Sequence, residues 1–177
     1  MGRSSPAEPR RPRGITVDER LRAADGVWAV GDPTGVALLT HVGKYQARVA
    51  AANVAGLDDT ADYRAIPAAV FTDPQVASVW RTEGDGVVTA SFRIESGRPS
   101  TYETPKRPGL VKLAADASEG VRVGAVAVGP ESGEWLGQVT LAVRGRVPLD
   151  VLLDTIQPYP TFSEAIFEAL RELESRL

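Results

Sequence analysis

The sequence predicts an α+β fold in which an antiparallel sheet is covered by helices, and two observations lead to this expectation. Between residues 68 and 128, short apolar segments alternate with turn-forming clusters, and from residue 133 onward apolar residues recur at helical spacing. Runs of strands followed by runs of helices are typical of such folds. The 177 residues, 43% of them hydrophobic and 24% charged, fit one main domain with extra segments.

The charge of the chain is unevenly distributed. Residues 1–14 hold four arginines and one glutamate, a sum of +3, while the whole chain has a net charge of −3. Three prolines and few apolar residues favour a disordered basic tail over 1–14. This tail lacks aromatic residues for base stacking, and no basic face follows it, so we expect no nucleic-acid partner.

Two kinds of feature that the sequence lacks restrict the classes of function that this chain can have. The chain has no cysteine, which excludes disulfides, thiolate metal sites and a dithiol redox centre supplied by this chain, and we expect no metal site. It also has no apolar run of membrane-spanning length and no hydrophobic core of a secretory signal, which predicts a cytoplasmic protein without a membrane partner.

A strand, a turn and a helix follow the tail. Residues 15–22 predict a short strand or turn, 27–30 a strand, and 38–55 a helix that Gly56 ends. Asp32, in the turn after the second strand, can accept hydrogen bonds from sugar-like hydroxyls. The N-terminus of the helix offers unpaired backbone N–H groups and a partial positive charge. Residues 57–67 are acidic and predict a linker.

The sheet is predicted from segments with strand-like patterns. Strands are expected at 69–72, 76–80, 87–94, 110–115 and 121–128, with clear period-two alternation in 87–94. The turn-forming cluster at 116–120 predicts an antiparallel hairpin.

Three helices are expected after the sheet. The first spans 133–144 and the second 149–155. The third begins at Thr161, whose spacing to Glu164 predicts a capping box, and it runs to the C-terminus with apolar residues on one side. Residues 68–177 therefore predict one self-contained domain with helices on one face of its sheet.

Several short motifs in a fixed order carry a family resemblance. They read ITVDE at 15–19, VWAVGD at 27–32, LLTH at 38–41, VFTDP at 70–74 and PYPTFSE at 158–164. In this order they resemble the C-terminal part of the FAD-dependent pyridine nucleotide–disulfide oxidoreductases. The chain is most similar to mercuric reductase and dihydrolipoamide dehydrogenase-like members.

The resemblance implies roles for the N-terminal motifs. Residues 15–56 would be the remnant of an FAD-binding domain, in which Asp32, after Gly31, accepts hydrogen bonds from the ribityl chain. Four residues would lie near the isoalloxazine, where helix N-terminal donors stabilise the negative charge of reduced flavin; they are Leu38, Leu39, Thr40 and His41. Alternatively, Gly31 and Asp32 only end a strand, and His41 is a packed or solvated helix residue.

The resemblance also implies a dimerisation domain over 68–177 that associates about a two-fold axis. In the family, a His acts as general acid/base towards the thiols, and a Glu five positions later orients this His. Here Tyr159 stands at the His position and Glu164 is retained. A Tyr with a pKa of about 10 cannot cycle protons at neutral pH, although mercuric-reductase-like members also place a Tyr there. Alternatively, Tyr159 is a packing residue and Glu164 only completes the capping box.

Three parts of a full family member are not found in this sequence: a Gly-x-Gly-x-x-Gly phosphate loop, a redox cysteine pair and an NAD(P)H domain. We therefore expect this chain alone to be inactive. Three hypotheses follow. The chain is a truncated family member that acts as a homodimeric dimerisation module, a subunit of a split oxidoreductase whose other chain completes the FAD site, or a stand-alone flavin-binding module.

Overall fold

The computed structural model describes residues 14–80, 82–94, 108–116 and 122–177 of the chain. The chain divides into two compact units, Met1–Asp62 and Tyr63–Leu177, which are described separately. Residues 1–13 of the predicted tail and residues 117–120 of the predicted turn lie outside the described residues.

The N-terminal unit contains a hairpin and one long helix. Strands β1 (Arg22–Ala24) and β2 (Val27–Trp28) pair antiparallel, and they are followed by the 3-10 helix η1 (Asp32–Thr34) and by α1 (Thr40–Val54). The helix agrees with the predicted 38–55. The predicted strand 27–30 is too long, because β1 offers only a short partner to β2.

The core of the N-terminal unit is small. Its buried cluster consists of Leu21, Val49 and Ala50. The segment after α1, predicted as part of a linker, is held to the rest of this unit by polar contacts. The Asp62 N–H donates to the Tyr45 hydroxyl at 2.7 Å, and the Ala61 N–H donates to the Glu19 carbonyl at 2.7 Å.

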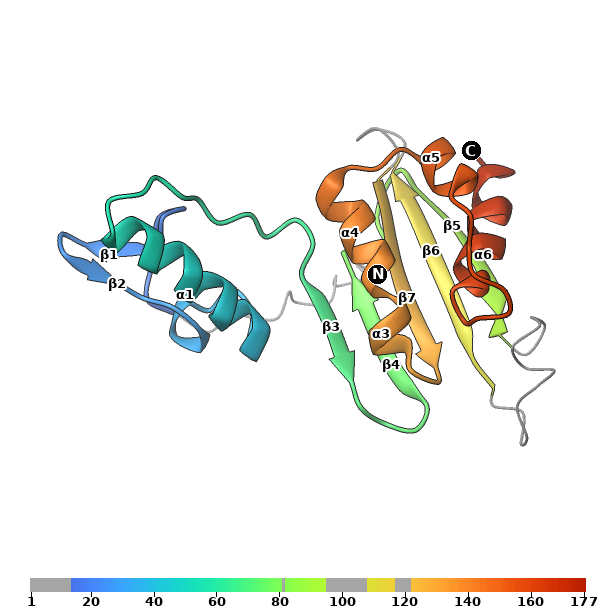
Figure 1. Cartoon of the computed structure of the whole chain (residues 1–177), viewed down its shortest axis with the longest axis horizontal. Coiled ribbons are helices and arrows are strands. Elements are labelled where there is room, and N and C mark those ends of the chain that lie inside the picture. The colour runs from blue at the N-terminus through green and yellow to red at the C-terminus, as the bar shows by residue number, and fades with distance from the viewer. Residues whose placement is uncertain (1–13, 81, 95–107, 117–121) are drawn as a thin grey trace, which may run out of the picture. The chain divides into compact units, whose positions relative to one another are not determined.

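The C-terminal unit is built on a five-stranded antiparallel sheet in the order β3-β4-β7-β6-β5 (Figure 1). The strands are β3 (Pro67–Val70), β4 (Gln75–Val79), β5 (Val87–Arg93), β6 (Leu110–Asp116) and β7 (Arg122–Gly129). β6 and β7 form the predicted antiparallel pair, with Leu113 opposite Ala125.

Helices cover one face of this sheet, as Figure 1 shows. They are α3 (Ser132–Trp135), α4 (Gly137–Gly145), α5 (Leu149–Asp154) and α6 (Glu164–Glu174). The hydrophobic core lies between the sheet and this layer, where the side chains of Val111 and Leu113 pack with Ile166, Leu170 and Leu173. None of the helices in the described ranges is long and apolar enough to span a membrane.

The predicted single helix over 133–144 is wrong, because the structure has two helices there. α3 ends at Trp135 and α4 begins at Gly137, with Leu136 between them. Glycine is among the poorest helix formers, so interrupting the helix next to Gly137 costs little free energy. The Trp135 indole is fixed by its Nε1–H, which donates to the Pro130 carbonyl at 2.8 Å.

The predicted capping box at the start of the last helix is also wrong. α6 begins at Glu164, and no side-chain hydrogen bond caps it. The Thr161 hydroxyl instead donates to the Pro158 carbonyl at 2.7 Å, and Oε2 of Glu164 is buried without a partner among the described residues. The predicted apolar side of this helix is present, since Ile166, Leu170 and Leu173 are buried.

Candidate functional site

The turn after β2 is fixed to α1 by one buried side chain. Oε1 of Gln46 accepts the Gly31 N–H at 2.6 Å, and Nε2 of Gln46 donates to the Thr34 hydroxyl at 3.1 Å. Gly31 has φ 78°, a conformation that glycine adopts without strain. The turn that holds Asp32 is thereby fixed to the helix that follows it.

A close backbone approach strengthens this arrangement. A Cβ at Gly43, in the first turns of α1, would lie 3.2 Å from the Gly31 Cα. The start of α1 therefore lies directly against the turn. The structure thus brings together the predicted residues at the turn and those at the helix start.

The carboxylate of Asp32 is available to a ligand. The residue is exposed, and within the part of the chain that the structure describes its side chain makes no hydrogen bond or ion pair. Asp32 begins η1, whose backbone supplies the Gly35 N–H bond to the Asp32 carbonyl at 3.0 Å. Its backbone is therefore fixed while its carboxylate can accept hydrogen bonds.

The N-terminus of α1 has no side-chain cap. Leu39 occupies the N-cap position with extended backbone, and its carbonyl accepts the Val42 N–H at 3.0 Å. Leu38, Thr40 and His41 are exposed around this end. An uncapped helix N-terminus offers backbone donors and partial positive charge to an electron-rich group.

Two residues that build this site, Gln46 and Gly43, are not among the predicted site residues. A signal for Gln46 was present, because it lies four residues after Val42 and three before Val49 on the buried face of α1. A polar residue on an apolar helix face needs a hydrogen-bond partner inside the fold. Nothing in the local pattern around Gly43 indicated which backbone it would approach.

The C-terminal pair of predicted site residues lies in the other unit. Tyr159 and Glu164 both line a cavity of about 360 Å³ beside α5 and α6, together with Asp154 and Glu168. The Tyr159 side chain is exposed, whereas Oε2 of Glu164 is buried and lacks a partner among the described residues. The structure therefore places both residues at one cavity, and their acid/base role stays a prediction.

Large apolar side chains are exposed on the helical layer of the C-terminal unit. Leu141 of α4 is 70% exposed and Ile156, after α5, is 95% exposed. Burial of these side chains against another molecule would remove apolar surface from water. Among the residues that the structure describes, no group of three His, Cys, Asp or Glu side chains is placed to hold a metal ion.

Comparison with known proteins identifies the family. Residues 66–170 match the dimerisation domain of the pyridine nucleotide-disulphide oxidoreductases. Dihydrolipoyl dehydrogenase 2 of Haloarcula marismortui is 36% identical over 163 residues, which cover 88% of this chain and 34% of that protein. A dihydrolipoyl dehydrogenase of Mycobacterium tuberculosis is 35% identical over 170 residues, covering 91% of this chain and 36% of that protein. The chain belongs to the pyridine nucleotide-disulphide oxidoreductase family.

Solved structures agree with this assignment. LpdA from Mycobacterium tuberculosis superposes with a TM-score of 0.79 at 30% identity, covering 90% of this chain and 36% of that one. A mutant of the HOCl-induced flavoprotein disulfide reductase RclA from Escherichia coli, solved as its Cu(II) complex, gives 0.75 at 26% identity, with coverage of 92% and 38%. The predicted family and α+β fold are confirmed, and the chain spans about a third of the length of these relatives.

Proposed function

We propose that the C-terminal unit joins two copies of this chain as a homodimer. The observation that carries this proposal is the match of residues 66–170 to a family dimerisation domain. The exposed apolar side chains of Leu141 and Ile156 support it, because burying them between two copies removes apolar surface from water.

Analytical ultracentrifugation of the full chain tests the homodimer. The wild-type chain should sediment as a dimer, and Leu141→Asp should shift it to a monomer because the interface would then bury an unpaired carboxylate. Ser91→Asp, which places the same charge at an exposed position on β5, is the matched control and should leave the dimer intact. A wild-type chain that stays monomeric at high concentration would exclude the proposal.

A second candidate function concerns the N-terminal unit. We propose that it forms part of an FAD site that a separate chain completes. The exposed carboxylate of Asp32 and the uncapped N-terminus of α1, held against the same turn by Gln46, favour this function. The given sequence has no Gly-x-Gly-x-x-Gly loop for the ADP half of FAD, so in this proposal that loop lies outside the given sequence.

The residues present fit only one portion of FAD. Asp32 would accept hydrogen bonds from ribityl hydroxyls, and the first turn of α1, from Thr40, would offer its partial positive charge to the flavin. FAD, when bound, supplies hydride and electron transfer. The chain's own part is to bind and orient this group.

Flavin fluorescence measures this second function. FAD should be retained only when the chain is co-expressed with a protein that carries the phosphate loop, and retention should fall about tenfold or more in Asp32→Ala because a charge-assisted hydrogen bond is lost. Thr60→Ala, at an exposed position in the segment after α1, is a control that should keep FAD. Saturable FAD binding by the chain alone would instead favour a stand-alone flavin module, and failure to retain FAD with any such partner would exclude both.

A further inference from the structure

The exposed side of α3 and α4 has a regular pattern. Four exposed positions follow one another at spacings of three, four and three residues: Glu134, Gly137, Leu141 and Arg144. Leu136 joins the two helices with right-handed helical backbone, φ −70° and ψ −13°, so the pattern continues across the junction. Residues at this spacing lie along one side of a helix, and the same spacing forms the line of contact between two packed helices.

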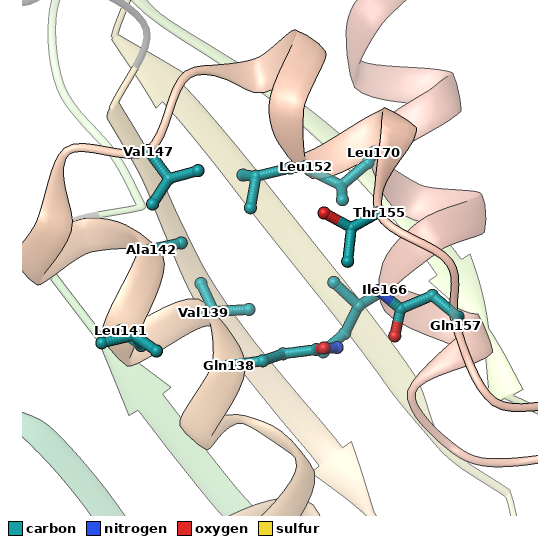
Figure 2. Close-up of a pocket in the computed structure, with 10 residues that line it drawn as sticks. All are labelled: Gln138, Val139, Leu141, Ala142, Val147, Leu152, Thr155, Gln157, Ile166 and Leu170. Carbon is teal, nitrogen blue, oxygen red and sulfur yellow. The ribbon is translucent and has the colours of Figure 1, made fainter.

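This side of α4 borders a recess in the helical layer. Leu141 is 70% exposed, and with Gln138 it lines a cavity of about 230 Å³ between α4, α5 and α6. Figure 2 shows the cavity between α4 and the two later helices, with Leu141 on the outer side of α4. Val139, Ile166 and Leu170 also line it, so most of its wall is apolar. A molecule that covers Leu141 and the recess therefore removes more apolar surface from water than this side chain alone exposes.

Gly137 forms a notch four residues before Leu141. Apart from its chain neighbours and the backbone of its own helix, no described atom lies within 4 Å of the point where a Cβ would stand. The backbone of Gly137 is helical, and alanine forms helices better than glycine does. Nothing in the described fold therefore requires glycine here. A large side chain from another molecule, in contrast, can approach the backbone closely at a residue without a Cβ.

A second copy of this chain is the partner that fits this side. The whole of α4 lies within residues 66–170, which match a dimerisation domain. In a dimer with a two-fold axis, each contact occurs twice with the copies exchanged. When two copies of α4 lie antiparallel with the axis at the level of Val139, residues equally far before and after 139 face each other. Leu141 then faces Gly137 of the second copy, and Glu134 faces Arg144 of the second copy.

We propose that α4 packs antiparallel against α4 of a second copy in this register. Each Leu141 enters the notch at Gly137 of the other copy, and each Glu134 pairs with Arg144 of the other copy. One register thus matches both the shape and the charge of the exposed side. This inference rests on the proposed homodimer and adds the helices, the register and the residue pairs that form it.

Disulfide formation tests the register directly, because the sequence has no cysteine. Chains with Gly137→Cys and chains with Leu141→Cys are purified separately, mixed to exchange subunits, and oxidised. A disulfide needs two Cα atoms within about 7 Å, so the mixture should give a covalent dimer with one chain of each kind, identified by mass spectrometry. Either variant alone should give little, because its two cysteines would lie four residues, about 6 Å, apart along the paired helices in addition to the distance between the helices.

The controls concern position and folding. Ser91→Cys, at an exposed position on β5, should form no disulfide with either variant. Gly137→Cys adds a side chain in open space and Leu141→Cys shortens an exposed one, so both chains should keep the wild-type amide spectrum in NMR. Disulfides that form equally well with Ser91→Cys would show random collision and would contradict the proposal.

Exchange of the two charges tests the ionic contact. Glu134→Arg and Arg144→Glu should each raise the Kd of the dimer by about three- to tenfold in analytical ultracentrifugation, because like charges then meet at two places in each dimer. The variant with both changes should return to within about threefold of the wild-type Kd. Positions 134 and 144 lie ten residues, about 15 Å, apart along the helices, so a contact within one chain does not explain such a recovery. A folded double variant that does not recover would overturn the pairing.

The outcomes separate this inference from the proposed function. A wild-type dimer that forms no disulfide between positions 137 and 141 would overturn the register and leave the homodimer intact. A wild-type chain that is monomeric at every concentration would exclude both.

Discussion

The two units of this chain differ most in how their folded states are held together. In the C-terminal unit, a sheet and a helical layer enclose a continuous core that includes Leu113, Ile166 and Leu173. In the N-terminal unit, the buried cluster consists of Leu21, Val49 and Ala50. Small units bury a smaller fraction of their apolar surface and are correspondingly less stable. The C-terminal unit thus has its own driving force for folding, whereas the N-terminal unit has little.

Polar contacts replace part of the missing core in the N-terminal unit. Arg20 pairs with Asp58 at 2.8 Å, and Arg48 pairs with Asp59 at 2.7 Å. Exposed ion pairs of this kind contribute little each. The unit that carries the candidate FAD residues is therefore the less stable one, which agrees with the proposal that a second chain completes it.

The largest expected effect is at Leu21, which is fully buried in the N-terminal unit. Leu21→Ala should remove a large part of the small core and unfold this unit, because Leu→Ala changes in cores cost about 2–5 kcal/mol. NMR should show loss of amide dispersion over residues 14–62 with the signals of 63–177 retained. Leu57→Ala, at an exposed position of the same unit, is the control. If the amide signals of residues 63–177 lost their dispersion as well, the two units would not fold independently, and the comparison would be wrong.

The corresponding change in the C-terminal unit should weaken it without unfolding it. Leu113→Ala removes a fully buried side chain from β6 and should lower the free energy of unfolding by about 2–5 kcal/mol. Urea denaturation measures this loss, with the partly exposed Leu110 of the same strand as control, for which Leu110→Ala should cost clearly less. Equal losses at the two positions would contradict the described core.

A smaller effect is expected at Gln46, the polar link in the N-terminal unit. Gln46→Leu leaves the Gly31 N–H without its acceptor and should destabilise this unit by about 1–3 kcal/mol. Hydrogen exchange at the Gly31 amide should accelerate accordingly. Lys44→Leu adds the same side chain at an exposed position of α1 and should leave the exchange unchanged. Unchanged exchange in Gln46→Leu as well would mean that this bond does not hold the turn.

The smallest effect is expected at Arg20. The hydrogen bond and charge of Asp58, with a contribution from Glu19, raise the pKa of the Arg20 guanidinium above its ordinary value. A group whose pKa is raised stabilises the fold below its unfolded pKa and loses this effect only as the pH rises through the folded value. Between about pH 5 and pH 9 Arg20 is charged in both the folded and the unfolded state, so it adds no pH dependence to the free energy of unfolding.

Arg20→Ala should therefore leave the urea midpoint of the N-terminal unit nearly unchanged at every pH in this range and at high salt. A clear shift would show that this ion pair, and not the small core, holds the unit.

Sequence patterns predicted the sheet and most helices well because the signals are local. The alternation over 87–94 gave a strand with Ala90 buried and Ser91 exposed. The apolar spacing of Ile166, Leu170 and Leu173 gave the buried face of α6. The spacing of Thr161 and Glu164 was misleading, because α6 begins at Glu164 without a side-chain cap and the Thr161 hydroxyl donates to the Pro158 carbonyl.

The candidate sites were predictable only in part. The resemblance to the family singled out Asp32, Tyr159 and Glu164, and the structure places the last two at one cavity. It did not indicate Gln46, because the partner of a buried carboxamide is set by the packing of α1 against the turn.

The sequence by itself determined the family, the order of the elements and the absence of a thiol, since these depend on residue identity and on spacing along the chain. Only the tertiary structure decided that Gly43 approaches Gly31, that α3 and α4 are separate helices, and that Gln138 faces an apolar cavity without a partner among the described residues. The physical reason is that close backbone approach, burial and hydrogen bonding depend on contacts between segments that are distant in the sequence. Local sequence patterns do not specify these contacts.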